Sequence, residues 1–208
     1  MLDKKWIVRI IAWGLSVATT IISLAIWLQA LGGRHSISTY KLFPLLGLVA
    51  FGLMWGHYIV GSLRRLLGVD KAVLERYFMV TGWIVLIAIV LHPGLLIWQL
   101  WRDGFGLPPG SVLENYVSPA LRGVTVLGSI SLLAFLAFEL HHKYRDRSWW
   151  CWVERASDVA ILLVAYHGLR LGSHLQRGWF QKVWIFYAIT LVVSLFYVYY
   201  SRIREDKL

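Results

Sequence analysis

Charge and cysteine are both scarce in this chain of 208 residues. Only 15% of the residues are Asp, Glu, Lys or Arg, whereas 58% are hydrophobic. Soluble domains carry roughly 25% charged residues, so this composition excludes a globule that faces water on all sides and indicates a membrane protein. The lone Cys151 excludes an internal disulfide and any zinc or iron–sulfur site made of thiolates, because each needs more than one cysteine.

Acidic residues are the scarcer of the two charged kinds. The chain has 11 Asp and Glu against 21 Lys and Arg, a formal net charge of +10. In a soluble protein this excess would suggest nucleic acid as a partner. Here the basic residues interrupt apolar runs instead of forming a stripe, which is typical of loops that face anionic lipid headgroups. We expect membrane lipid as a partner and no nucleic acid.

Long apolar runs are what the sequence has in quantity. Four runs contain no charged residue and reach the ~20 residues that a helix needs to cross a bilayer. They cover residues 10–33, 42–63, 77–101 and 183–201. With two weaker runs, the sequence predicts an all-α integral membrane protein, a single domain with a six-transmembrane-helix bundle. The predicted spans cover about residues 8–32, 42–64, 77–101, 118–140, 150–171 and 182–201.

The fifth predicted span is the weakest by hydropathy, because Glu154, Arg155 and Asp158 fall in its first half. An ionisable group at membrane depth costs a few kcal/mol unless it faces protein or water, so this span marks either a function or a buried ion pair. Glu154 and Asp158 could form a proton path. An ion pair with Arg76 or Arg155 is the favoured role.

Six spans place both termini on one side of the membrane. That side carries twice as many Lys and Arg residues as the other, and the positive-inside rule assigns it to the cytoplasm. We therefore predict a multi-pass protein of a bacterial inner membrane or another cell membrane, with both termini cytoplasmic. The longest external loop, residues 102–122, is rich in Gly and Pro, which oppose regular structure. It forms either a lid over an external site or an ordinary connection.

Three of the seven histidines, His57, His92 and His167, lie within predicted spans. His92 and His167 each lie about 22 Å along a helix that runs outward, so the two imidazoles are level in the outer part of the bilayer. Two level imidazoles on co-directional helices suit bis-histidine ligation of a haem iron. The alternative is a pair of core histidines bonded to backbone carbonyls or hydroxyls.

His57 is expected in the inner half of the bilayer and cannot join the same haem. It could pair with His141, but a structural imidazole is favoured. The remaining histidines fall in or beside loops, where a solvated or interfacial imidazole is expected: His35, His141, His142 and His174.

Segments around His92 and His167 resemble a known family. The runs LRRLLG at 63–68, RYFMVTG at 76–82 and LHP at 91–93 are similar to the third-helix region of the ferric reductase-like transmembrane domain. AYHG at 165–168 resembles the fifth-helix outer motif of that domain. The family includes ferric reductases, the membrane part of NADPH oxidases and the haem-binding subunit of the periplasmic methionine sulfoxide reductase system, and the resemblance covers about residues 40–200.

In that family two haems are typically stacked across the membrane, each held by two histidines. At the family's spacing the inner partner of His92 would be Phe78 and that of His167 would be Glu154, and neither side chain can replace a ligating histidine. The resemblance therefore implies a single haem b on the outer-leaflet side. The layout is closest to the methionine sulfoxide reductase subunit, a six-span protein without a fused flavin domain, although that subunit keeps a histidine at the position of Glu154.

A haem at this site implies an electron-transfer subunit rather than a complete enzyme. Arg170, three residues beyond His167, could pair with a haem propionate, and Arg102 is a second candidate, although outward arginines also serve as lipid-headgroup anchors. The donor would be a membrane quinol or a flavoprotein, or a flavin in the inner half, and the acceptor an external redox partner. The alternative function is a haem-free polytopic protein, transporter-like or an assembly subunit, whose histidines only link helices. An integral enzyme that acts on lipid is a further, weaker alternative.

Overall fold

A computed structural model of the chain describes residues 3–32, 38–172, 175–176 and 178–205. Within these residues the fold is entirely helical and contains no strand. The long helices are α1 (Lys4–Leu31), α2 (Thr39–Leu66), α3 (Glu75–Arg102), α5 (Arg122–Phe138), α7 (Trp150–Leu171) and α8 (Trp179–Glu205). The short ones are η1 (Lys71–Leu74), α4 (Gly110–Asn115), η2 (Pro119–Leu121) and α6 (His141–Tyr144). The predicted all-α class is confirmed.

Five of the helical segments are long and apolar enough to cross a membrane. They are Lys4–Leu31, Thr39–Leu66, Lys71–Arg102, Pro119–Phe138 and Trp179–Arg204. Large apolar side chains project from the outside of the bundle, among them Trp83, 62% exposed, and Phe196, 75% exposed. Such surfaces are stable against lipid and not against water. α7 has 22 residues but is not one of the five, because its charged residues lower its hydropathy.

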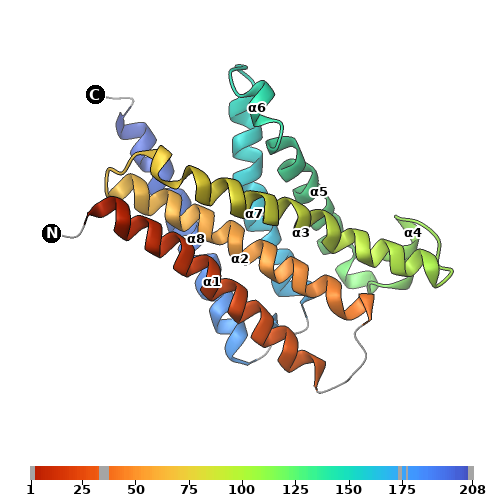
Figure 1. The fold of residues 1–208 in the computed structure, drawn as a ribbon. Helices are drawn as coiled ribbons and strands as arrows, with labels where there is room; N and C mark the ends of the chain where they lie inside the picture. The colour runs from red at the N-terminus through yellow and green to blue at the C-terminus, as the bar shows by residue number, and fades with distance from the viewer. Residues whose placement is uncertain (1–2, 33–37, 173–174, 177, 206–208) are drawn as a thin grey trace.

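α2 lies at the centre of the bundle and packs against α1, α3 and α8, while α5 packs against α7. Figure 1 shows α1, α2 and α3 side by side, with the α5–α7 pair set obliquely to them. The beginning of α1 and the end of α8 lie at the same end of the bundle (Figure 1). We call this the inner end and the opposite end the outer end.

The core between α2 and α8 is aromatic. The Phe51 and Trp184 rings stack with centroids 4.2 Å apart, and those of Trp55 and Tyr187 lie 4.4 Å apart. The Trp55 indole N–H also donates a hydrogen bond to Thr190 Oγ1 at 2.9 Å. Aromatic pairs in this range contribute roughly 0.5–1.5 kcal/mol beyond the area that they bury. They fix α8 against α2, the helix on which α3 is also positioned.

α2 and α3 both end in a Schellman motif built on a left-handed glycine. Gly68 has φ +65°, and the Val69 N–H donates to Arg64 O at 3.0 Å. Gly104 has φ +87° and ends α3 in the same way. Only glycine adopts this conformation without a steric penalty, so these two positions set where the chain turns.

Candidate functional site

His92 projects from α3 toward α2, where the backbone holds its ring. Its Nδ1 lies 2.7 Å from the Phe43 carbonyl oxygen, and the Phe43 ring lies 5.3 Å from the imidazole. Gly47, four residues after Phe43, faces the imidazole directly. A Cβ at Gly47 would lie 2.8 Å from Cε1 and 2.9 Å from Nδ1 of His92, closer than such contacts allow. The His92 ring therefore occupies a position that only glycine leaves open.

His167 projects from α7 toward α5 and is held in the same way. Its Nδ1 lies 2.9 Å from the Val124 carbonyl oxygen. A Cβ at Gly128, four residues after Val124, would lie 2.5 Å from Cε1 and 2.6 Å from Nδ1 of His167. The two histidines thus share one local design, a carbonyl at position i and a glycine at i+4 on the neighbouring helix.

This design fixes the tautomer of both rings. A backbone carbonyl can only accept a hydrogen bond, so each Nδ1 must carry the proton and donate it. The lone pair is then on Nε2 of His92 and of His167. Among the described residues neither Nε2 has a hydrogen-bond partner. Metal-ligating histidines commonly have this arrangement, in which one ring nitrogen donates to a carbonyl and the other binds the metal.

Neither Nε2 atom is fully buried in the protein. The fully buried side-chain polar atoms without a partner in the described part of the chain are Ser111 Oγ and Tyr187 Oη, and neither Nε2 is among them. α3 and α7, which carry the two imidazoles, share almost no backbone contact, whereas α2 packs on α3 and α5 packs on α7. The rings are held by the flanking helices, not by each other's helix.

The outer loop packs onto the residue that holds His92. Contrary to the expectation of an irregular loop, residues 102–122 contain the helical turns α4 and η2. Tyr116 of this loop stacks on Tyr40 with centroids 5.9 Å apart and meets the Phe43 ring edge-on at 6.0 Å. Phe43 in turn supplies the carbonyl for His92. The loop therefore covers the outer end of the α2–α3 contact.

Arg102 belongs to a polar network at the outer end. Its guanidinium donates to Gln99 Oε1 at 3.0 Å and lies 4.0 Å from Asp103. Asp103 also accepts hydrogen bonds from Gln99 Nε2 at 2.9 Å and from the Tyr40 hydroxyl at 2.8 Å. These hydrogen bonds, that of Gln99 first, hold the pKa of the Asp103 carboxyl below its usual range.

Arg170 lies near the outer end of α7 with an exposed side chain. The side chain forms no hydrogen bond or ion pair with other described residues, and its backbone carbonyl accepts a hydrogen bond from Gln176 Nε2 at 2.8 Å. Among the described residues, neither Arg170 nor Arg102 is hydrogen-bonded to His92 or His167. Their pairing with a propionate stays a prediction.

His57 has a hydroxyl partner within the bundle. Thr81 Oγ1 donates to the Tyr77 carbonyl at 2.7 Å, so it accepts the hydrogen bond from His57 Nε2 at 2.6 Å. The ring also meets Phe78 edge-on at 5.3 Å. These contacts fit the structural role favoured for His57. His35 and His174 lie outside the described residues, as does the side chain of His142.

The acidic residues of α7 are paired, but not with the residues expected from the sequence. Glu154 forms an ion pair with Arg202 of α8 at 3.7 Å, so the expectation of Arg76 or Arg155 as its partner is wrong. The Arg155 guanidinium instead lies 4.9 Å from the Trp152 ring centroid.

Asp158 accepts a hydrogen bond on each carboxylate oxygen, from Tyr58 at 3.0 Å and from Tyr199 at 2.7 Å. The carboxylate thereby joins α2, α7 and α8. Each oxygen of the carboxylate thus accepts a hydrogen bond from a tyrosine hydroxyl. These two hydrogen bonds offset part of the cost of its half-buried position.

The sequence identified both histidines but missed what holds them. The sequence does not mark Gly47, Gly128 and Tyr58, and it indicates only an interfacial position for Tyr199, because a helical glycine or an interfacial tyrosine is ordinary in a membrane protein. The described residues contain no group of three or more His, Cys, Asp or Glu that could hold a metal ion. The candidate site is the His92–His167 pair, whose rings share one hydrogen-bond design. Comparisons of the chain with protein-family models, curated proteins and solved structures give no match.

Proposed function

We propose that this protein is a single-haem membrane cytochrome in which His92 and His167 bind haem b near the outer face. The observation that carries the proposal is the repeated design around the two rings. Each Nδ1–H donates to a carbonyl on a neighbouring helix, and neither Nε2 is fully buried or has a partner among the described residues. Two neutral imidazoles with available Nε2 lone pairs are the ligands that a six-coordinate haem iron needs.

The chain's own residues set the properties of this site. The carbonyls of Phe43 and Val124 orient the rings and raise the basicity of the ligating nitrogens. Gly47 and Gly128 let the rings lie close to the helix backbones. Arg170, with Arg102 as second candidate, pairs with the propionates at the outer end. Haem b, when bound, supplies one-electron redox chemistry, and the protein tunes its potential through burial and these hydrogen bonds.

The proposal includes α7 as a sixth span and both termini on the cytoplasmic side. A span with acidic residues is acceptable when those residues face protein partners. Asp158 has two tyrosine partners and Glu154 has Arg202, so both acidic residues in the inner half of α7 have protein partners. At the inner end the lysines and arginines follow the positive-inside rule.

Electrons enter from the inner side and leave to an acceptor at the outer face. The level of Phe78 lies about 21 Å of helix rise from that of His92, which is a long distance for direct transfer from a cytosolic flavoprotein. The donor is therefore a membrane quinol or a flavin held in the inner half of the bundle. A membrane quinol needs no additional soluble domain.

An absorption spectrum of the protein purified from haem-replete cells tests the proposal. We expect a low-spin b-type Soret band with one haem per chain. His92→Ala and His167→Ala each abolish that band, because each removes one axial ligand. His57→Ala is the matched control. The His57 ring is hydrogen-bonded to Thr81 and is not a proposed ligand, so this substitution should leave the Soret band unchanged.

A stable, colourless wild-type protein would refute the cytochrome and favour the alternative, a haem-free helix bundle with structural histidines. That alternative accounts for the two Nδ1–H hydrogen bonds equally well. It gives no role to the two Nε2 atoms, which is why the cytochrome is preferred.

A further inference from the structure

The inner end of the bundle contains a strongly basic cleft of about 360 Å³. Its charged lining consists of Arg64, Arg65, Lys71, Arg145, Arg202 and the single acid Glu154. These residues come from the end of α2, from η1, from the segment after α6, and from α7 and α8. We call this pocket the inner basic cleft. The basic residues come from four of these five segments, so the fold concentrates positive charge at one place.

Two of the cations in this cleft have no partner among the described residues. Glu154 pairs with Arg202 at 3.7 Å. The side chains of Lys71 and Arg145 form no ion pair or hydrogen bond with other described residues. Like charges gathered in one cleft repel each other, so the arrangement costs free energy unless an anion enters.

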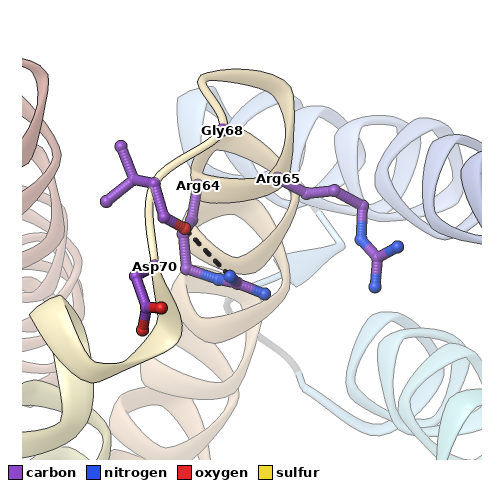
Figure 2. Close-up of a pocket in the computed structure, with 5 residues that line it drawn as sticks. Arg64, Arg65, Gly68 and Asp70 are labelled. Carbon is purple, nitrogen blue, oxygen red and sulfur yellow. Dashed lines mark hydrogen bonds between the residues drawn. The ribbon is translucent and has the colours of Figure 1, made fainter.

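Arg64 is preorganised at the edge of the cleft. Its Nη1 donates a hydrogen bond to the Val69 carbonyl at 3.0 Å, and Figure 2 shows this bond holding the guanidinium against the turn, while Arg65 extends away from it. Both arginines also line an adjoining pocket of about 400 Å³ together with Gly68, Val69 and Asp70 (Figure 2). A guanidinium held in place by the backbone loses less entropy when it binds an anion than a freely rotating one.

The rest of the lining indicates an amphiphilic ligand. Phe138 and Trp150 also face the inner basic cleft, with ring centroids 6.1 Å apart. The paired N–H groups of an arginine guanidinium match the geometry of phosphate oxygens. Basic pockets between membrane helices on the cytoplasmic side bind anionic lipid headgroups. The aromatic rings suit the glycerol and first acyl carbons of such a lipid, which a small free anion lacks.

We propose that the inner basic cleft is a phosphate-binding site occupied by the headgroup of an anionic phospholipid. The shared chemistry is the phosphate group, which a lipid or a soluble phosphate ester could supply. The aromatic lining favours the lipid. This inference does not rest on the haem proposal, because the residues of the cleft and those around His92 and His167 are separate sets.

The test uses the full chain in nanodiscs of phosphatidylcholine, with or without cardiolipin, and counts retained lipid by native mass spectrometry. We expect wild type to retain cardiolipin in preference to phosphatidylcholine. Lys71→Gln and Arg145→Gln should each weaken retention about fivefold, since one cation near anionic lipid contributes about 1 kcal/mol. Arg145→Lys keeps the charge and should restore most of the binding.

Arg147→Gln is the matched control, because Arg147 is basic, exposed and two residues from Arg145 but does not line the cleft. It should retain cardiolipin like wild type. Equal loss in Arg147→Gln and Arg145→Gln would overturn the proposal, because the effect would then be general surface charge.

A second arm titrates inorganic phosphate into the same nanodiscs at constant ionic strength, with chloride as the reference salt. Displacement of cardiolipin by phosphate and not by chloride supports a headgroup site. Phosphate binding without any retained cardiolipin would overturn the lipid assignment in favour of a soluble phosphate ester. The Soret band of every variant should match wild type, so failure here and failure of the cytochrome proposal give different results.

Discussion

The histidines and acidic residues within the helices have different partners in the outer and inner halves of the bundle. In the inner half, His57 is bonded to Thr81, Asp158 accepts two tyrosine hydroxyls, and Glu154 pairs with Arg202. In the outer half, His92 and His167 each use one ring nitrogen and leave the other without a protein partner. The contrast separates polar groups that hold helices together from polar groups that are available to a ligand.

Free energy explains why this contrast is informative. A buried acceptor without a hydrogen bond costs about 1–3 kcal/mol, and the inner half avoids that cost at each of these side chains. The outer half instead leaves both Nε2 atoms without a protein hydrogen bond and places a glycine against each ring. The proposed haem would give both of these open acceptors a partner.

The largest expected effect comes from filling the space that Gly128 leaves for the His167 ring. In Gly128→Ala the new Cβ would lie 2.5 Å from His167, so the ring must leave its position. We expect loss of the Soret band with unchanged helical content by circular dichroism. Gly123→Ala lies on the same helix with open space around it and is the control. Full haem content in Gly128→Ala would show that Gly128 is not needed to position His167 as an axial ligand.

Gly47→Ala tests the same design at the other ring and should have a smaller effect. Its Cβ would lie 2.8 Å from His92, so a smaller movement relieves the clash. We expect a partial loss or a shift of the Soret band, measured against Gly61→Ala, where a Cβ meets nothing. An effect larger than that of Gly128→Ala would contradict this ranking.

Substitutions in the inner half should lower the free energy of unfolding and leave the Soret band unchanged. Asp158→Ala removes two hydrogen bonds between helices and leaves two hydroxyls unpaired, so we expect a loss of about 1–2 kcal/mol in the free energy of unfolding. Tyr199→Phe removes one of these hydrogen bonds and should cost about half as much. Denaturant unfolding in detergent measures both. A changed Soret band in either variant would break the separation between the two halves.

How far the sequence predicts the fold differs between helices for a physical reason. Residues 150–171 were predicted as the fifth span, and α7 is Trp150–Leu171, because charge and Gly172 delimit it in the sequence. α8 runs from Trp179 to Glu205, beyond the predicted 182–201. Hydropathy identifies only the apolar part of a helix, whereas backbone hydrogen bonding continues through the polar residues at both interfaces.

The candidate site also has features that the sequence predicts and features that it does not. Helix rise and direction were enough to suggest that His92 and His167 lie at one level. The partners of the rings could not be predicted, because Phe43 and Val124 contribute only backbone carbonyls, which every residue has. The Asp158 contacts with Tyr58 and Tyr199 join residues far apart in sequence, and only the packing of α2, α7 and α8 brings them together.

The smallest expected effect is a pH dependence at the outer loop. Hydrogen bonds from Gln99 and Tyr40 lower the pKa of Asp103, so their stabilising contribution is complete above the pKa of the unfolded chain and is lost only as the pH falls through the lower, folded value. We expect protease access to residues 104–109 to stay constant from neutral to mildly acidic pH and to rise only below the usual carboxyl range. Asp103→Asn cannot titrate and should show no such transition. A transition at ordinary carboxyl pKa values, or one that persists in Asp103→Asn, would show that Asp103 does not hold the loop over the outer end of the α2–α3 contact.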